Sequence, residues 1–425
     1  MPFEFAPPPR IAVVGGGISG LGAAYDLARW SNVTLFEACP TLGGHARTIM
    51  AGRNGDTPVD TGFIVFNYPN YPHLTRLFAE LDVPVKLSDM SFSATIGDGW
   101  MEYGLKNIDA IIGTRRNLAR PQFWRMISDI LKFNRHALAL AGDPNLSLGE
   151  FLDRMSLGDW FRRYYLLPLS GAIWSSTPDQ MESFPARSLV QFFENHALLT
   201  RNNHQWHTVD GGSIEYVRRV AASIQAKGSE IRTGAPIAGV RRDASGNYVR
   251  AHGGEWERFD HVVFACHSDD ALALLESPTE AEHHALSRLR YQSNHAILHS
   301  DVRQMPKRKR VWASWVFQSL DDQPRPVIGI TYWMNLLQGI SQEDQLFVSL
   351  NPARSIPDEL IYDQTEFRHP IFDVAAIQAQ GDLKALQGQN NTWYCGAYTR
   401  HGFHEDGLAS GVAVAERIAE METVR

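Results

Sequence analysis

The chain has 425 residues, of which 44% are hydrophobic and 20% charged, and its formal net charge is −7. This composition is typical of a globular protein and excludes a disordered or fibrous chain, and the length suits two domains of about 150 residues each. The acidic balance argues against nucleic acid as a partner.

The cysteines and the start of the chain bear on the compartment. Cys39, Cys266 and Cys395 are scattered and odd in number, so we expect free thiols, with neither a disulfide framework nor a metal site. Residues 1–10 are rich in proline and lack the basic and then apolar pattern of a signal peptide, and no apolar run approaches about 18 residues. These features predict a cytoplasmic protein without a membrane-spanning segment.

A strand, a tight glycine turn and a helix are predicted first. Residues 11–14 form the strand and run into Gly15-Gly16-Gly17-Ile18-Ser19-Gly20, and a second strand at 33–36 is followed by Glu37. A pyrophosphate sits on such a helix N-terminus, where the backbone comes close enough to donate N–H groups. The pattern therefore predicts a dinucleotide-binding unit, the alternative being a glycine-rich turn in an unrelated α/β protein.

Each glycine of this turn has an expected role. Gly15 allows the turn, Gly17 removes a side chain that would face the phosphate, and Gly20 lets the helix pack against the strand. Glu37 lies at the spacing of about 20 residues expected for the acid that accepts hydrogen bonds from the adenosine ribose. A carboxylate there favours a free 2′-hydroxyl over a 2′-phosphate.

The rest of the chain alternates between two kinds of sequence pattern. Residues 68–207 are rich in helical patterns and aromatics, residues 208–286 return to strands and an amphipathic helix, residues 287–387 are again aromatic, and a last strand and helix follow. We therefore predict a nucleotide-binding domain made of residues 1–67, 208–286 and 388–425, and an inserted substrate domain made of residues 68–207 and 287–387.

Several separated motifs follow the ribose acid in order. They are Leu42-Gly43-Gly44-His45, Val59-Asp60-Thr61-Gly62-Phe63-Ile64, the strand start Pro236-Ile237, and Gly402-Phe403-His404-Glu405-Asp406-Gly407-Leu408. Together they resemble the flavin-dependent amine oxidase superfamily, which includes monoamine oxidases, protoporphyrinogen oxidases and phytoene-type desaturases. The resemblance implies an α/β fold: an FAD-binding Rossmann-like domain of the glutathione-reductase type with an inserted, discontinuous α+β substrate domain.

The resemblance also implies the cofactor and its contacts. The cofactor is FAD, held without a covalent bond, because Cys395 lies inside the last strand and not in a loop well upstream of the closing helix. In this family a helix N-terminus points at the flavin pyrimidine ring, where it stabilises the negative charge of reduction. The expected cofactor-binding residues are Gly15, Gly17, Ile18, Ser19, Gly20, Glu37, Ala38, Gly43, Gly44, His45, Thr61, Gly62, Phe63, Ile64, Ile237, Gly396, Glu405, Asp406, Gly407 and Leu408.

Departures from the family pattern bear on catalysis. Amine oxidases place a lysine beside flavin N5 on a strand that corresponds to residues 293–299, and this run contains no lysine. The absence of this lysine weakens the hypothesis of amine oxidation. It makes His295, together with His404, a candidate acid or base, the alternative being a solvated or core histidine. We expect Glu405 to be structural or to cap the closing helix. Ala397 stands where the family often has an acid.

Within the superfamily, four further phrases point to a narrower group. Gly62 to Asn67, Arg120 to Arg125, Phe193 to His196 and Tyr332 to Asn335 look like bacterial flavoproteins associated with methylated and furan fatty acid synthesis and with methyltransferases. This resemblance implies an FAD-dependent dehydrogenase or desaturase that transfers a hydride from an apolar substrate, such as a methylated fatty acyl chain of a phospholipid, to flavin N5. The alternatives are an oxidase of a hydrophobic amine and a non-redox flavoprotein that carries lipid to a methyltransferase partner.

An acyl substrate would require an apolar tunnel. The candidate substrate contacts are Trp174, Trp315, Tyr332 and Trp333, with Phe92, Trp100, Phe123 and Phe192 as further lining residues. Each of these side chains can equally be plain core.

A basic run could bring the protein to a membrane surface. Its members are Arg303, Lys307, Arg308, Lys309 and Arg310. Such a cluster suits anionic headgroups and would allow peripheral contact with the inner membrane face, but a run of this kind is usually a solvated loop, so both interpretations stay open. The electron acceptor, whether oxygen, a quinone or a protein partner, stays open.

Overall fold

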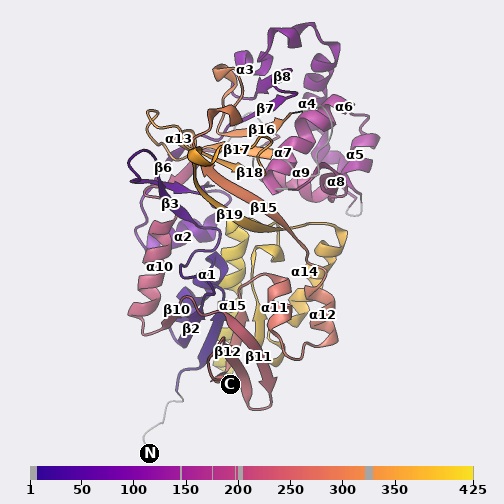
Figure 1. Cartoon of the computed structure of the whole chain (residues 1–425). Coiled ribbons are helices and arrows are strands. Elements are labelled where there is room, and N and C mark those ends of the chain that lie inside the picture. The colour runs from indigo at the N-terminus through magenta and orange to yellow at the C-terminus, as the bar shows by residue number, and fades with distance from the viewer. Residues whose placement is uncertain are drawn as a thin grey trace, which may run out of the picture.

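The computed structural model describes residues 7–143, 146–174, 176–196, 198–199, 204–320 and 329–424. Residues 1–6, part of the start used above to predict the compartment, lie outside the described residues. Figure 1 shows a parallel sheet and its helices in the lower half, and a second sheet with a group of helices in the upper half.

The lower half is built on five parallel strands. Their order is β10 (Glu230–Arg232), β2 (Asn32–Phe36), β1 (Arg10–Val14), β14 (His261–Phe264) and β20 (Thr392–Tyr394). Residues 11–13 of the central strand β1 are completely buried, which is typical of a parallel sheet covered on both faces. The predicted strands at both ends of the chain therefore lie in one sheet.

Alternation along β1 divides the packing between two layers. Ile11 and Val13 face a core with helices α1 (Ile18–Leu27), α10 (Ile214–Ala226) and α15 (His404–Val424). The alternate residues, Ala12 and Val14, face a second core. This second layer contains the antiparallel strands β11 (Ile237–Asp243), β12 (Gly246–Ala251) and β13 (Glu257–Phe259) and the helices α11 (Ser268–Leu274), α12 (Glu280–Leu286) and α14 (Val374–Leu386).

The upper half is built on a seven-stranded sheet. Its order is β19 (Ile361–Pro370), β15 (Tyr291–His299), β18 (Phe347–Leu350), β17 (Gly329–Trp333), β16 (Trp315–Ser319), β7 (Phe92–Ile96) and β8 (Met101–Gly104). Neighbours run antiparallel except β16 and β7, which run parallel. The longest strands, β15 and β19, run between the two halves in Figure 1.

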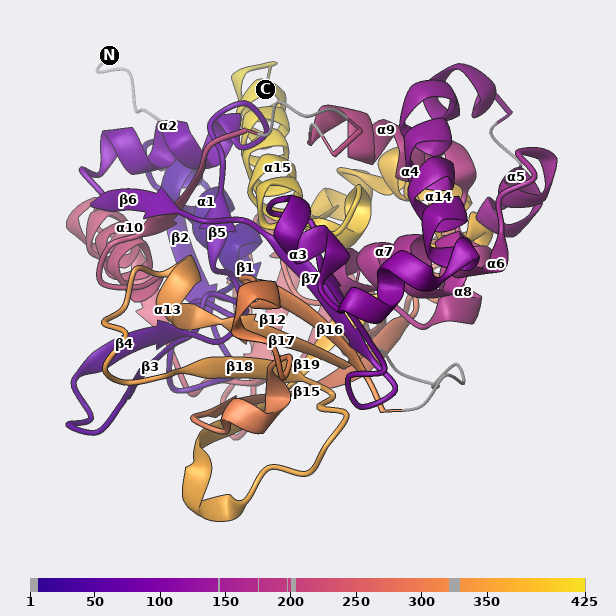
Figure 2. The same ribbon diagram turned by 90° about the horizontal axis from the view of Figure 1, so that it is seen from above.

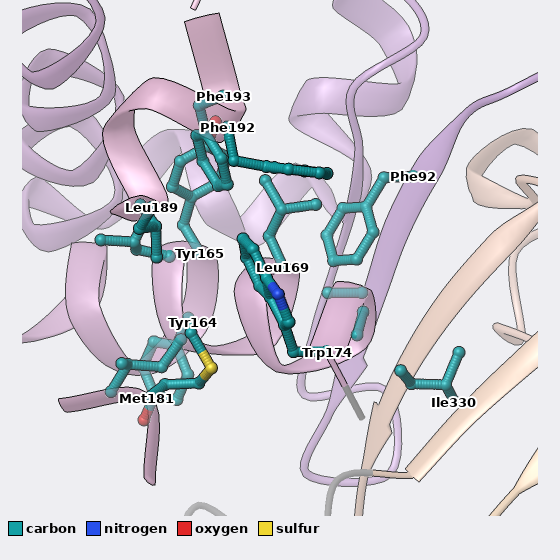
Figure 3. Packing of buried hydrophobic residues seen from close by; sticks show 14 of the residues in the cluster. Phe92, Tyr164, Tyr165, Leu169, Trp174, Met181, Leu189, Phe192, Phe193 and Ile330 are labelled. Atoms are coloured by element: carbon teal, nitrogen blue, oxygen red, sulfur yellow. The ribbon is translucent and has the colours of Figure 1, made fainter. Parts of the chain in front are cut away.

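Helices pack on this sheet through a large apolar core. They are α4 (Pro121–Leu140), α5 (Leu148–Arg154), α6 (Asp159–Phe161), α7 (Leu167–Trp174), α8 (Pro178–Glu182) and α9 (Ala186–Asn195), which Figure 2 shows grouped on one side. Figure 3 shows side chains of this core, with Phe92 and Ile330 contributed by strands and Trp174 lying beside them.

Smaller elements complete the structure. They are α2 (Pro72–Glu80), α3 (Ile108–Ile112), α13 (Met334–Leu337), the pair β3 (Thr48–Ala51) and β4 (Thr57–Asp60), and a sheet of β5 (Val65–Phe66), β9 (Trp206–Val209) and β6 (Val85–Ser88). The predicted fold class, a Rossmann-like α/β domain with an inserted α+β part, is confirmed. Of the helices in the described part of the chain, none is both long and apolar enough to cross a bilayer.

Candidate functional site

The glycine loop after β1 has the geometry that its sequence predicts. Gly15 has φ +113°, and a Cβ there would lie 2.7 Å from the carbonyl oxygen of Ala265. A Cβ on Gly20 would lie 1.8 Å from the carbonyl oxygen of Gly15. Both positions therefore require glycine, the first for its left-handed conformation and the second because helix and loop touch.

Gly17 differs because its α-carbon faces open space. The nearest atom that a Cβ would meet is the α-carbon of Gly44, at 4.0 Å. Gly17 is the N-cap of α1, and the first turn, Ile18-Ser19-Gly20, carries no acidic side chain. The first N–H groups of a helix have no intrahelical acceptor, so the positive end of α1 faces this space and can bind an anion.

Two further segments close around the loop. Glu37 accepts hydrogen bonds from the backbone N–H of Gly16 at 2.7 Å and of Cys39 at 2.8 Å. The N–H of Ala235 donates to the carbonyl oxygen of Glu37 at 2.9 Å, which brings the start of β11, where Ile237 lies, beside the acid. Each carboxylate oxygen keeps a lone pair for a further donor such as a ribose hydroxyl. Ala38 is exposed beside them.

The start of α15 lies against the same loop. A Cβ on Gly407 would come within 2.9 Å of Ser19 Oγ, so α15 approaches α1 closely only because Gly407 has no side chain. Leu408 is buried, and a Cβ on Gly22 would lie 2.3 Å from its Cδ1. Leu408 is therefore a packing residue between the two helices.

His404, the first residue of α15, is fixed on two sides. Its ring stacks on Phe63 with centroids 3.8 Å apart, and its Nε2 lies 2.8 Å from the hydroxyl oxygen of Tyr216. The N–H of Phe63 donates to the carbonyl oxygen of His45 at 2.8 Å, and a Cβ on Gly62 would lie 2.1 Å from that oxygen. Thr61 and Gly62 therefore lead the chain tightly past His45, and Ile64 then enters the core of the upper half.

Four histidines, which we call the histidine cluster, lie close together here: His45, His267, His369 and His404. The ring centroid of His45 is 5.2 Å from that of His369 and 6.3 Å from that of His267. Burial lowers the pKa of His45 and His267 to about 4 and that of His369 and His404 to about 3. The cluster is therefore uncharged at neutral pH.

Asn294 and His369 lie on the face of the β15–β19 pair that turns toward this cluster. Asn294 is fully buried, with its Nδ2 2.9 Å from His369 Nδ1 and its Oδ1 accepting from Asn351 Nδ2 at 2.8 Å. Side chains alternate along a strand, so His295 points to the opposite face. The structure does not bring His295, one of the two candidate bases, together with the histidine cluster.

The two acids after His404 do not face the open space. Glu405 accepts hydrogen bonds from the backbone N–H groups of His73 at 2.8 Å and Leu74 at 3.0 Å, so it caps α2 and not the closing helix. Burial raises the pKa of Glu405 to about 7. Asp406 accepts from the N–H groups of His401 and Phe403, in the turn before α15.

The end of the last strand bears on two of the predictions, the state of Cys395 and the polar contact missing at Ala397. Cys395 is fully buried in the sheet region after β20, so its sulfur faces packed side chains. The N–H of Gly396 donates to Ser410 Oγ at 2.9 Å, so a hydroxyl from α15 provides a polar group beside Ala397.

Aromatic side chains of the upper half reach the residues just before His404. Trp174 Nε1 donates to the carbonyl oxygen of His401 at 3.2 Å, and Phe192 stacks on Phe403 with centroids 4.6 Å apart. Trp315 and Tyr332 pack edge to face at 4.9 Å and belong to the same side of the sheet. Trp333 packs instead on Trp312 on the other side, so it does not join the other three candidate substrate residues.

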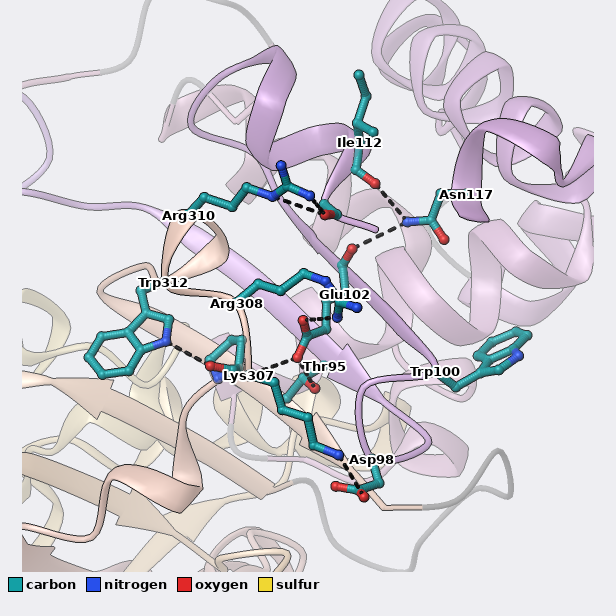
Figure 4. A network of polar contacts seen from close by, with 12 residues as sticks. Thr95, Asp98, Trp100, Glu102, Ile112, Asn117, Lys307, Arg308, Arg310 and Trp312 are labelled. Atoms are coloured by element: carbon teal, nitrogen blue, oxygen red, sulfur yellow. Dashed lines mark hydrogen bonds and ion pairs between the residues drawn. The ribbon is translucent and has the colours of Figure 1, made fainter. Parts of the chain in front are cut away.

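The basic run is largely neutralised by neighbouring acids. Lys307 pairs with Asp98 at 2.8 Å, Arg308 with the buried Glu102 at 2.6 Å, and Arg303 with Asp301 at 2.8 Å. Figure 4 shows the first two pairs, together with Arg310, which donates to the carbonyl oxygen of Gly113. These residues do not form the free basic surface that their sequence predicts.

Sequence reasoning missed His267, Tyr216, Asn294, His369 and Phe403. Phe403 directly precedes a predicted site residue, and the alternation Phe367-Arg368-His369 on a long strand could have identified His369. Tyr216 lies in the first turn of an amphipathic helix, and its sequence carries no signal for a contact with His404.

The sequence profile of the family described as flavin containing amine oxidoreductase matches residues 18–325. A protein of Mycobacterium tuberculosis described as a flavin-containing monoamine oxidase is 24% identical over 267 residues, which are 58% of this chain and 54% of that protein. A Synechococcus elongatus protein described as a zeta-carotene desaturase is 25% identical over 240 residues, which are 52% of this chain and 49% of that protein. The chain thus spans about half the length of these curated relatives.

Solved structures share the fold. One, described as a protoporphyrinogen oxidase from Exiguobacterium sp. 255-15, superposes with a TM-score of 0.71 at 18% identity and covers 97% of this chain and 99% of that one. A structure described as a CLA-producing fatty acid isomerase from P. acnes superposes with a TM-score of 0.69 at 14% identity and also covers 97% of this chain and 99% of that one. At these identities the likeness establishes the fold alone.

Proposed function

The chain belongs to the family of flavin-containing amine oxidoreductases, and on that basis we propose that it is an FAD-dependent dehydrogenase or desaturase acting on an apolar substrate. The proposal rests chiefly on one observation. The groups gathered at the start of α15 are neutral or aromatic, namely the histidine cluster and the side chains of Phe63, Trp174, Phe192 and Phe403.

The residues present fit FAD, the cofactor of the family. The open space at Gly17, at the positive end of α1, suits the pyrophosphate, and Glu37 suits the ribose. His45 Nε2 is buried and has no partner among the described residues, so it is available to a polar atom of the cofactor. When bound, FAD supplies a ring that accepts a hydride at N5. With Cys395 buried, we propose non-covalent binding.

The chain's own residues would position the substrate, stabilise negative charge and hold a proton. The N-terminus of α15 presents the positive end of a helix dipole, which favours negative charge beside His404. Tyr216 occupies His404 Nε2, so Nδ1 is the atom left to hold or release a proton. The rings of Trp174, Phe192 and Phe403 contact one another and would exclude water from the side chain of His404.

A methylated fatty acyl chain of a phospholipid is the substrate that we propose. The neutral surroundings suit a hydrocarbon, and the burial that lowers the pKa of His45 and His404 also disfavours a charged group of the substrate there. The strand β15 carries no lysine, the residue that resembling amine oxidases use beside N5. The fold is shared with a protein described as a fatty acid isomerase, so an acyl chain is compatible with it.

The first test is anaerobic titration of the purified holoprotein while following flavin absorbance at about 450 nm. One series receives phospholipids with methylated acyl chains, and a matched series receives hydrophobic amines. Bleaching by lipid supports the proposal. Bleaching by amines alone would assign the protein to amine oxidation, and reduction by neither would favour a lipid carrier that works with a methyltransferase.

Two histidine variants sharpen this test. We expect His404→Asn to slow flavin reduction at least about tenfold. Tenfold is a cautious lower bound, because loss of a general acid or base usually slows a reaction by more than that. His295→Asn is the matched control, since its side chain lies on the other face of β15, and it should leave the rate unchanged. A rate loss in His295→Asn alone would reverse the two assignments.

A further inference from the structure

Exposed hydrophobic side chains gather at one end of the upper half. Of the fourteen large hydrophobic residues that are exposed in the described part of the chain, eight lie between residues 100 and 140. Scattered exposed hydrophobics are normal, but a concentrated set marks an interaction surface. Ile108, on α3, is 77% exposed, and Trp124, on α4, is 50% exposed.

Specific contacts fix the two tryptophans of this set. Trp124 Nε1 donates to the carbonyl oxygen of Leu118 at 3.0 Å. Arg120 lies over the ring of Trp100 at 4.2 Å and donates to its carbonyl oxygen. We call Trp100, Ile108, Leu118 and Trp124 the apolar tip. Ile108 lies on α3 and Trp124 on α4, whereas Trp100 directly precedes β8 and Leu118 lies between α3 and α4. Figure 1 shows β8, α3 and α4 at the end of the molecule opposite to the parallel sheet.

The apolar tip continues along α4. Trp124, Leu131 and Leu138 are spaced by seven residues and are all exposed, so they form one line on the solvent side of the helix. Arg135 is also exposed on this helix. An amphipathic surface with aromatic and basic groups is typical of helices that lie in a membrane interface.

Charge at the tip is opposite to that of the whole chain. Residues 97–140 contain seven basic and four acidic side chains, and residues 307–310 are all basic, whereas the net charge of the protein is −7. A cavity of about 500 Å³ beside Trp100 is lined by Arg115, Arg116, Arg308 and Arg310.

Two arginines of this cavity are free to bind an anion. Glu102 neutralises Arg308, and Asp109 lies 3.3 Å from Arg310. Arg115 and Arg116 are exposed and form no ion pair with any acid that the structure describes. Guanidinium groups bind phosphate oxygens in a planar, bidentate geometry, so this cavity suits a phosphate group.

We propose that the apolar tip and its arginine cavity dock the protein on a bilayer that contains anionic phospholipid. The cavity receives a lipid phosphate, and Trp100, Ile108, Leu118 and Trp124 enter the headgroup region, where tryptophan is favoured. The binding surface thus consists of Arg115 and Arg116 with the apolar tip, and not of Lys307, Arg308 and Arg310, which are paired with acids. Docking does not depend on the proposed reaction, because it is measured without turnover.

The test is co-sedimentation of the holoprotein with vesicles of phosphatidylcholine alone or of phosphatidylcholine and phosphatidylglycerol in equal parts. We expect binding to the anionic vesicles that weakens as salt is added. The double variant Arg115→Glu with Arg116→Glu should bind at least about tenfold more weakly, since each basic group near an anionic surface contributes roughly a factor of five. Ile108→Ser should also bind more weakly.

Matched controls make the same changes in net charge and hydrophobicity at places away from the tip. Arg218→Glu with Arg417→Glu makes the same change in net charge on α10 and α15, and Leu87→Ser removes another exposed side chain, on β6. Both controls should bind like the wild type. Equal binding to both kinds of vesicle, or equal losses in tip and control variants, would overturn the proposal. So would binding of inorganic phosphate without vesicle binding, because the cavity would then belong to a soluble anion.

Discussion

Gly15, Gly17 and Gly20 differ in what an added side chain would meet. At Gly15 and Gly20 a Cβ would collide with backbone oxygens at 2.7 Å and 1.8 Å. At Gly17 it would reach no protein atom closer than 4.0 Å. The first two glycines are therefore required for folding of the loop, whereas Gly17 keeps space for a ligand.

We expect Gly17→Val to separate cofactor binding from folding. The variant should fold with the thermal stability of the wild-type apoprotein but bind FAD at least tenfold more weakly, because losing hydrogen bonds to a charged group costs about 1.5–3 kcal/mol. The measurement is the ratio of flavin to protein absorbance after purification, together with an FAD titration. Gly20→Val is the contrasting variant and should lower stability itself. Normal FAD binding by Gly17→Val would show that the phosphate lies elsewhere.

At the scale of elements, Glu405 ties α15 to α2. It is 8% exposed and accepts two hydrogen bonds from the first turn of α2, although it lies 332 residues away from His73 along the chain. Burial raises its pKa from 4.5 to about 7. The folded protein therefore binds a proton at Glu405 over a pH range in which the unfolded chain has released it.

This shift predicts a pH dependence with a definite sign. Between pH 4.5 and about 7 the folded state holds more protons at this site than the unfolded state, so stability falls as pH rises through that window. The contribution is on the order of 1–3 kcal/mol. Glu405→Gln cannot ionise, so the difference in unfolding free energy between wild type and variant should shrink or reverse as pH rises. Urea unfolding at pH 5 and at pH 7.5 measures it, and a constant difference would contradict the shift.

The elements that sequence predicts best are those fixed by local chemistry. The loop at Gly15–Gly20 follows from the conformations that only glycine adopts, and Glu37 follows from spacing. His295 shows the limit of such reasoning, because a shift of one residue along a strand turns the side chain to the other face and makes Asn294 the inward residue. Trp333 faces away from Tyr332 for the same reason.

Contacts between distant segments could not be predicted. The basic run Lys307–Arg310 is unusual in the sequence, but its partners Asp98 and Glu102 come from a strand and turn about 200 residues earlier. Likewise, Glu405 precedes Asp406 at the start of a helix and suggests a cap for that helix, whereas the free N–H groups it binds belong to α2. Pairing of this kind is decided by the packing of the whole chain.

At the scale of the whole molecule, the expected cofactor contacts are confined to the lower half and its border. They come from the loop after β1, the turns at Gly43–His45 and Thr61–Ile64, and the start of α15. The core of the upper half is closed by its own aromatics, among them Phe133 and Phe193 with centroids 6.3 Å apart. A ligand raises the local stability of the regions that bind it, and it leaves the stability of a separately packed core unchanged.

We therefore expect removal of FAD to act on one half of the molecule. In hydrogen exchange followed by mass spectrometry, the apoprotein should lose protection in residues 15–20, 43–47 and 61–64 and at the start of α15, where open backbone N–H groups and glycines depend on the ligand for order. Peptides from α4 and α5 should exchange as in the holoprotein, because their buried faces lie in the upper core. Gly17→Val, at an FAD concentration that saturates only the wild type, should reproduce the pattern of the apoprotein. Equal loss of protection in α4 and α5 would instead mean that the two halves unfold as one cooperative unit, and the cofactor would then stabilise the substrate region as strongly as its own site.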